Sequence, residues 1–128
     1  MEIVKNKIDD NITQINMGLD FDETTKEVTG EIELDIENQS YFVESLESVL
    51  NNNISNIIVN LTNVSYIDSS GLWAIFEGHK KAKNLNGDLV LLNPNKDVER
   101  VLEITKLSSK LKIFTSVEEA KNSFFVTN

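Results

Sequence analysis

The fold is decided by residues 57–92, which read IIVNLTNVSYIDSSGLWAIFEGHKKAKNLNGDLVLL. Apolar runs at 57–61 and 88–92 are typical of strands covered on both faces, as in a parallel sheet flanked by helices. Residues 69–85 have the spacing of a helix, and we expect Gly87 to supply its left-handed cap. Since a strand–helix–strand unit makes a right-handed parallel crossover, the stretch predicts an α/β fold.

The sequence before this stretch adds two strands and a helix. Residues 12–21 and 28–34 alternate in the manner of strands, with the polar stretch 22–26 as the turn between them. From about residue 37 to residue 50 the apolar side chains recur three or four positions apart, which indicates an amphipathic helix.

The sequence after it continues the alternation of helix and strand. We expect a helix over 98–105, a short strand over 111–114, and a last helix that Ser116 opens with a capping-box pattern. The expected order is therefore β-β-α-β-α-β-α-β-α. It predicts one α/β domain over residues 1–128, with helices packed on a single sheet.

The composition restricts the cellular setting. The first eight residues hold no uninterrupted apolar stretch, and no apolar run approaches the roughly 20 residues that a membrane helix needs. Cysteine is absent, which removes disulfides and thiolate nucleophiles. We therefore expect a cytoplasmic protein that does not insert into a membrane.

The charge is unevenly distributed along the chain. The formal net charge is −9, and residues 1–55 hold 13 Asp and Glu against 3 Lys, whereas residues 56–128 hold 8 acids and 9 bases. Such an acidic protein repels phosphate backbones, so we do not expect it to bind nucleic acid directly. The acidic half is either a solvated surface or a surface that meets a basic partner.

Residues 64–72, VSYIDSSGL, join the first apolar run to the following helix. Partners and ligands meet open α/β sheets at the carboxyl ends of strands. Ser69 or Ser70 is suited to the N-cap position, and one interpretation is that the segment is only a capped helix start. The other is that Ser69 is phosphorylated, because a helix N-terminus favours a phosphoryl group and the added charge would switch binding.

The segment 60–72, NLTNVSYIDSSGL, resembles the signature of STAS domains, in particular those of bacterial anti-sigma factor antagonists. Residues 30–35, GEIELD, are similar to the Gly-Glu-Leu-Asp that precedes the first helix of the family, and residues 98–114 resemble its third helix and last strand. The resemblance implies a single STAS-like domain. Its fold would be a four- to five-stranded mixed sheet with about four helices packed on it.

The resemblance also implies a function. In antagonists the first serine of the motif, here Ser69, is phosphorylated by an anti-sigma factor that is also a serine kinase. The unphosphorylated form captures the anti-sigma factor and frees a sigma factor for transcription, and a serine phosphatase resets the switch. The chain is then a substrate and not an enzyme, and it needs no cofactor. The residues expected to meet the partner are Asp35, Asp68, Ser69, Ser70, Gly71 and Trp73.

Two features depart from the family pattern. Residues 30–35 carry two extra residues, which affects the placement of Asp35. Trp73 stands where a small residue is usual, and it is either a core aromatic or an exposed contact residue on the same helix face as Ser69. The expected core face of this helix consists of Leu72, Ile75, Phe76 and His79.

His79 is the only histidine, and it bears on the enzymatic alternatives. Ten residues of helix place it about 15 Å from Ser69, too far to act as a general base. A single histidine without cysteines does not predict a metal site, and residues 20–23 lack the Gly and terminal Glu of a calcium loop. The remaining alternative is a constitutive STAS binding subunit, for example of a lipid-transport ATPase, in which Ser69 is not modified.

Overall fold

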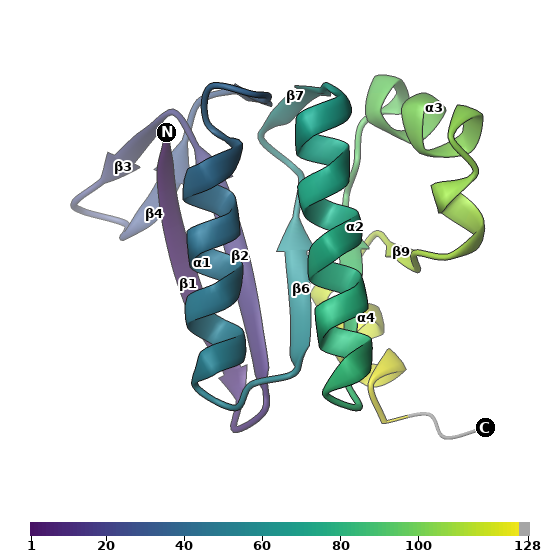
Figure 1. The fold of residues 1–128 in the computed structure, drawn as a ribbon. Helices are drawn as coiled ribbons and strands as arrows, with labels where there is room; N and C mark the ends of the chain where they lie inside the picture. The colour runs from purple at the N-terminus through teal and green to yellow at the C-terminus, as the bar shows by residue number, and fades with distance from the viewer. Residues whose placement is uncertain (126–128) are drawn as a thin grey trace.

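The computed structural model describes residues 1–125 and contains a central five-stranded sheet in the order β1-β2-β6-β8-β9 (Figure 1). Its strands are β1 (Glu2–Asp9), β2 (Ile12–Gly18), β6 (Asn56–Asn60), β8 (Asp88–Leu92) and β9 (Ile113–Phe114). β1 runs antiparallel to β2, and all other neighbours are parallel. The mixed five-stranded sheet confirms the predicted fold class.

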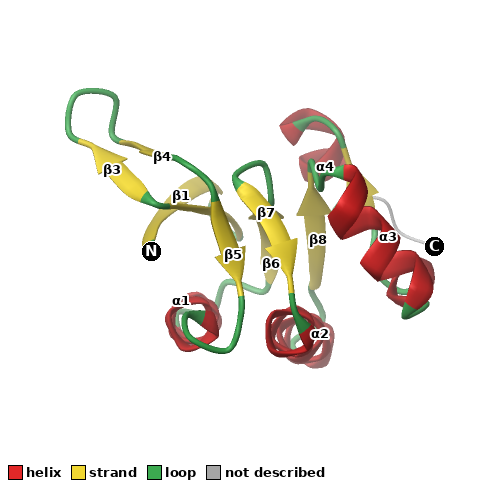
Figure 2. Cartoon of the chain, turned by 90° about the horizontal axis from the view of Figure 1, so that it is seen from above, coloured by secondary structure: helices red, strands yellow, loops and turns green. Residues whose placement is uncertain are grey.

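Helices cover both faces of this sheet. The described residues form α1 (Gln39–Asn51), α2 (Ser69–Asn84), α3 (Lys96–Ile104) and α4 (Val117–Ser123), with a short 3₁₀ helix, η1 (Leu107–Ser109). Figure 2 shows α1 and α2 side by side on one face and α4 on the other. None of the helices within residues 1–125 is long and apolar enough to cross a bilayer.

The two-sided cover explains the unbroken apolar runs. In β6, Ile57 and Val59 belong to the large core that α1 and α2 share. Ile58 points to the other face, where it belongs to a smaller core with Ala120 of α4. Because successive side chains of a strand point to opposite faces, a strand buried on both sides shows no polar alternation.

The N-terminal region differs from the prediction. β1 was not predicted. The two expected strands each divide, the first into β2 and β3 (Asp20–Asp22), the second into β4 (Glu27–Thr29) and β5 (Ile32–Leu34). β3 and β4 pair as an antiparallel hairpin around the expected turn, whereas β5 pairs in parallel with the unpredicted β7 (Val64–Ile67).

The end of α2 corrects the expected role of Gly87. Asn86, with φ 66°, adopts the left-handed conformation, and Gly87 does not. Asn tolerates this conformation because its short polar side chain bonds locally. Gly87 is needed for another reason: a Cβ there would overlap the carbonyl group of Ser55.

The predicted start of the last helix is confirmed. Ser116 is the N-cap of α4, and its hydroxyl accepts a hydrogen bond of 3.1 Å from the N–H of Glu119. The preceding helix, α3, begins in the same way at Asn95, whose Oδ1 accepts from the N–H of Val98 at 2.8 Å. Side-chain caps thus fix both C-terminal helices at the positions where the sequence offers a suitable oxygen.

Candidate functional site

The motif residues lie at the junction of β7 and α2. β7 ends at Ile67 and α2 begins at Ser69, so that only Asp68 separates the strand from the helix. Asp68 has an extended backbone, with φ −90° and ψ −176°, and is the N-cap of α2. The motif therefore lies at the carboxyl end of a strand, but this strand is the unpredicted β7, whereas the motif was expected to follow the strand at 57–61 directly.

Asp68, and neither serine, caps the helix. Its Oδ1 accepts hydrogen bonds from the backbone N–H groups of Ser70, at 2.8 Å, and Gly71, at 3.0 Å. The expectation that Ser69 or Ser70 is the N-cap is therefore wrong. A carboxylate is well suited to the position because one oxygen accepts both N–H groups and the other remains free for a third donor. Ser69 becomes the first helical residue and is exposed.

The third donor comes from the loop before α1. The N–H of Ile36 donates to Oδ2 of Asp68 at 3.1 Å, and the N–H of Asp68 donates to the carbonyl oxygen of Leu34 at 3.1 Å. These two bonds join the end of β5 and the following loop to the start of α2. Asp68 therefore holds two segments together that are more than thirty residues apart in the chain.

Asp35 lies within this loop and shapes it. Its Oδ1 accepts from the backbone N–H groups of Glu37, at 3.0 Å, and Asn38, at 3.2 Å. The structure thus brings Asp35 close to the helix start, next to Ile36 in the chain, and leaves it half-buried. A carboxylate that accepts two backbone bonds is committed to its own turn.

Gly71 lies against the end of β5. A Cβ on Gly71 would overlap the carbonyl oxygen of Leu34 and lie 2.9 Å from its Cγ. The absence of a side chain at Gly71 therefore allows the first turn of α2 to contact the backbone of β5. This approach is what brings the Asp35 loop next to Ser69.

Trp73 is exposed, which excludes the interpretation of this residue as a core aromatic. It retains 62% of its accessible surface, one turn after Ser69. Between α2 and the segment that follows α3 there is a hollow of about 240 Å³. The hollow is lined by Ser69, Leu72, Trp73, Phe76, Thr105 and Leu107. Of the expected core face, Ile75 and His79 are buried, but Leu72 and Phe76 are only half-buried and line this hollow.

Further exposed apolar side chains lie on the segments that meet at this end of the molecule. Ile36 is 72% exposed, Tyr66 of β7 is 47% exposed, and Ile104 at the end of α3 is 73% exposed. Sequence reasoning missed all three. The exposure of Ile36 could have been suspected, since it is an apolar residue within a polar loop. Ile104 is more than thirty residues after the motif in the sequence, so its place at the same end of the molecule could not be predicted.

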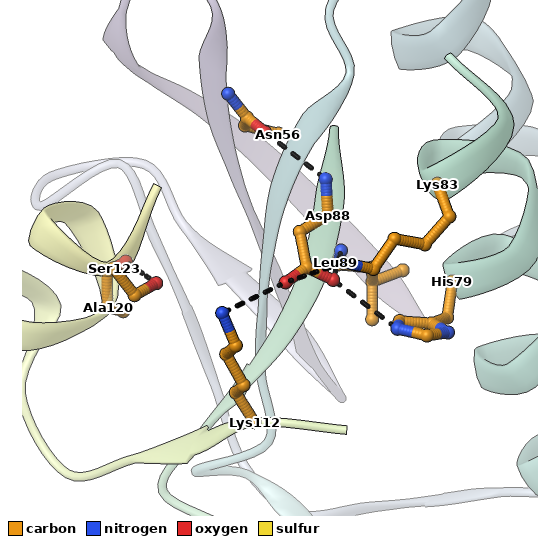
Figure 3. A network of polar contacts seen from close by, with 8 residues as sticks. All are labelled: Asn56, His79, Lys83, Asp88, Leu89, Lys112, Ala120 and Ser123. Atoms are coloured by element: carbon orange, nitrogen blue, oxygen red, sulfur yellow. Dashed lines mark hydrogen bonds and ion pairs between the residues drawn. The ribbon is translucent and has the colours of Figure 1, made fainter. Parts of the chain in front are cut away.

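His79 belongs to a separate buried cluster around Asp88 (Figure 3). Oδ1 of Asp88 lies 3.3 Å from Nε2 of His79, and Oδ2 lies 3.7 Å from Nζ of both Lys83 and Lys112. Nε2 of His79 is buried and makes no hydrogen bond among residues 1–125. Burial lowers the pKa of His79, and the nearby Asp88 opposes this shift.

This cluster does not supply a catalytic partner for Ser69. His79 is ten residues further along α2, a distance of about 15 Å. In residues 1–125, no group of three or more His, Cys, Asp or Glu side chains is arranged to hold a metal ion.

We expect Asp68→Ala to destabilise the protein by about 2–3 kcal/mol, because three backbone N–H groups lose their acceptor. Asp68→Asn, which keeps one acceptor oxygen, should cost less. Urea unfolding followed by circular dichroism measures both. Glu31→Ala removes the same charge from an exposed position and should leave the midpoint almost unchanged. Equal midpoints for Asp68→Ala and Glu31→Ala would contradict the assigned cap.

The fold and the placement of the motif are those of a small α/β domain whose strand–helix junction is exposed, and comparisons with known proteins identify its family. Residues 19–120 match the STAS domain family. The anti-sigma-B factor antagonist of Staphylococcus aureus is 36% identical over 107 residues, which cover 80% of this chain and 98% of that protein. The chain belongs to the STAS domain family.

Solved structures agree with this assignment. The Thermotoga maritima protein TM1081 superimposes with a TM-score of 0.78 at 28% identity, covering 97% of this chain and 95% of that one. SpoIIAA of Bacillus in its unphosphorylated form has a TM-score of 0.74 at 18% identity and covers 99% of this chain and 100% of its own. At that identity the likeness to SpoIIAA concerns the fold.

Proposed function

We propose that this protein is an anti-sigma factor antagonist whose binding is switched by phosphorylation of Ser69. The observation that carries the proposal is the position of Ser69, which is exposed as the first residue of α2 and borders an apolar hollow beside Trp73. The name of the Staphylococcus aureus relative supports the same class of partner. Asp68, Gly71 and Trp73 would form the surroundings of Ser69 that the partner meets, together with Ser70 and the Asp35 loop.

A phosphoryl group on Ser69 would face solvent. Two N–H groups of the first turn already donate to Asp68, so the phosphoryl oxygens would find few intramolecular donors. The group would instead add about −1.5 to −2 charges next to an existing carboxylate and beside apolar side chains. We expect the fold to tolerate this change, because Ser69 itself is exposed.

The consequence falls on the partner. A surface that fits a neutral hydroxyl and an exposed Trp73 would have to desolvate a dianion after phosphorylation. In the proposed cycle the unmodified chain captures an anti-sigma factor with serine kinase activity and frees a sigma factor, and a serine phosphatase restores the hydroxyl. The chain itself catalyses nothing, contacts no nucleic acid, and works in the cytoplasm as one STAS domain.

The test is to incubate the purified chain with ATP and the anti-sigma factor kinase from the same cells, followed by intact mass measurement and peptide mapping. We expect a single added phosphate on Ser69. The matched variants are Ser69→Ala, which should not be labelled, and Ser70→Ala, which should be labelled like the wild type because Ser70 is half-buried. A phosphate that persists in Ser69→Ala would place the modification elsewhere and refute the switch.

The alternative is a constitutive STAS subunit of a lipid-transport ATPase or another signalling complex. The exposed Trp73, which stands where the family usually has a small residue, is the observation in its favour. Under this alternative, Ser69 remains unmodified in the kinase reaction, and Ser69→Asp still co-purifies with the membrane ATPase. Labelling of the wild-type chain by the kinase and co-purification of Ser69→Asp with the ATPase therefore separate the two functions.

A further inference from the structure

The hollow next to Ser69 continues along α2. A second hollow, of about 250 Å³, lies further down the helix, and Phe76 lines both. The other residues of the second hollow are His79, Lys80, Lys83, Asn84 and Lys110. Thr105 and Leu107 border the first hollow and Lys110 borders the second, so one wall is α2 and the other is the segment after α3. The two hollows adjoin at Phe76, and we call them together the α2 groove.

The α2 groove is apolar at one end and basic at the other. Its Ser69 end is lined by Leu72, Trp73 and Leu107, whereas the charged residues that line its far end are all lysines. This is notable in a chain with 21 acidic and 12 basic residues. Burial lowers the pKa of His79, which favours its neutral form.

The lysines of the groove are only partly neutralised by carboxylates of the protein. Phe76 lines both hollows. Nζ of Lys80 and Nζ of Lys110 each lie 5.7 Å from the centre of its ring. Lys80 pairs with Glu77 at 3.3 Å, but Lys110 has no ion-pair partner among residues 1–125.

Lys83 shares its carboxylate partner with a second lysine. Oδ2 of Asp88 lies 3.7 Å from the ammonium groups of both Lys83 and Lys112. One carboxylate balances the charge of only one of these two ammonium groups. The far end of the groove therefore presents excess positive charge to whatever occupies it.

We propose that the α2 groove receives an extended, acidic segment of the anti-sigma factor, with an apolar side chain in the hollow at Trp73 and carboxylates at the lysine end. The inference rests on the proposed function and names the chemistry of the partner. Ser69 and Lys83 lie fourteen positions apart in α2 and are therefore separated by about 21 Å along the helix, a length that an extended segment of about six or seven residues matches. A phosphoryl group on Ser69 would then block the apolar end and repel the acidic segment.

Charge complementarity is the reason for proposing an acidic segment as the ligand of the groove. Residues 1–55 are strongly acidic and would repel an acidic partner, whereas the lysines of the α2 groove would attract it and steer it to the groove. An exposed lysine contributes little to a contact by itself, but several that converge on one groove raise the association rate and fix the orientation of the bound segment.

The test is isothermal titration calorimetry of the chain with its purified anti-sigma factor, at about 50 and 300 mM NaCl. We expect Lys80→Glu/Lys110→Glu to bind about 10- to 100-fold more weakly than the wild type at low salt, with a flatter dependence on salt. The matched control is Lys7→Glu/Lys26→Glu, which makes the same charge change at two exposed lysines in ion pairs outside the groove. It should bind within about threefold of the wild type.

The possible outcomes distinguish failure of the proposed function from failure of the acidic-segment proposal. A wild-type chain that does not bind the anti-sigma factor at all would refute the proposed function and this inference together. A wild-type chain that binds, with the groove and control variants equally affected, would overturn the inference alone. Circular dichroism of each variant confirms that it is folded. Sedimentation of the free chain measures its oligomeric state and so tests whether a second copy of the chain occupies the groove. A dimer that Lys80→Glu/Lys110→Glu dissociates would assign the groove to a second copy.

Discussion

Ser69→Asp is expected to bind the anti-sigma factor about 100-fold more weakly than the wild type, and the Ser69-phosphorylated chain up to about 1000-fold more weakly. The first loss corresponds to about 3 kcal/mol and the second to about 4 kcal/mol. The reason is that the new charge lies between the carboxylate of Asp68 and the apolar hollow beside Trp73, where bound partner atoms would remove its water. Asp carries one charge and fewer acceptor oxygens than phosphate, so its effect is the smaller.

Calorimetric titration of the anti-sigma factor measures these affinities. Ser69→Ala should bind like the unmodified wild type and, unlike it, should not weaken after incubation with ATP and the kinase. Asn122→Asp is the matched control, because it adds one negative charge at an exposed residue of α4, outside the α2 groove. If Ser69→Asp binds as tightly as Asn122→Asp, charge at Ser69 does not control the partner.

The fold was largely accessible from the sequence because its central elements are specified locally. The runs at β6 and β8 are apolar on both faces, and the spacing of α1 and α2 is that of amphipathic helices. β1 lacked such a signal. It lies at the edge of the sheet, and its exposed Lys5, Asn6 and Lys7 alternate with nothing buried. β1 is held in the sheet by its antiparallel pairing with β2. The periodicity of a sequence gives no information on such a pairing between strands.

Only those parts of the candidate site that are adjacent in the sequence could be predicted, and the contacts between distant segments could not. The motif indicated a helix start and suggested Ser69 or Ser70 as its N-cap, but Asp68 caps the helix. Asp68 also accepts a hydrogen bond from the N–H of Ile36 in a distant loop, a contact that the spacing of residues along the chain does not indicate. The same limit applies to the α2 groove, whose second wall, from Thr105 to Lys110, is brought to α2 only by the packing of α3 and η1.

Gly71→Ala is expected to destabilise the protein by about 3–5 kcal/mol, because the new methyl group would overlap the carbonyl oxygen of Leu34. That oxygen cannot move away freely, since it accepts a hydrogen bond of 3.1 Å from the N–H of Asp68. The start of α2 would have to separate from β5. The bond between Asp68 and the N–H of Ile36 would be strained as well.

Gly78→Ala, in the same helix, supplies the comparison. Its Cβ would lie 2.8 Å from Cδ1 of Leu46, the end of a flexible side chain that can rotate away. Both variants gain the helix propensity of Ala, about 1 kcal/mol, so the difference between them isolates the contact with the backbone. Urea unfolding should therefore show Gly78→Ala within about 1 kcal/mol of the wild type and Gly71→Ala far below it. Similar midpoints for the two variants would mean that β5 yields to α2 without cost, and that the approach of the Asp35 loop to Ser69 does not depend on Gly71.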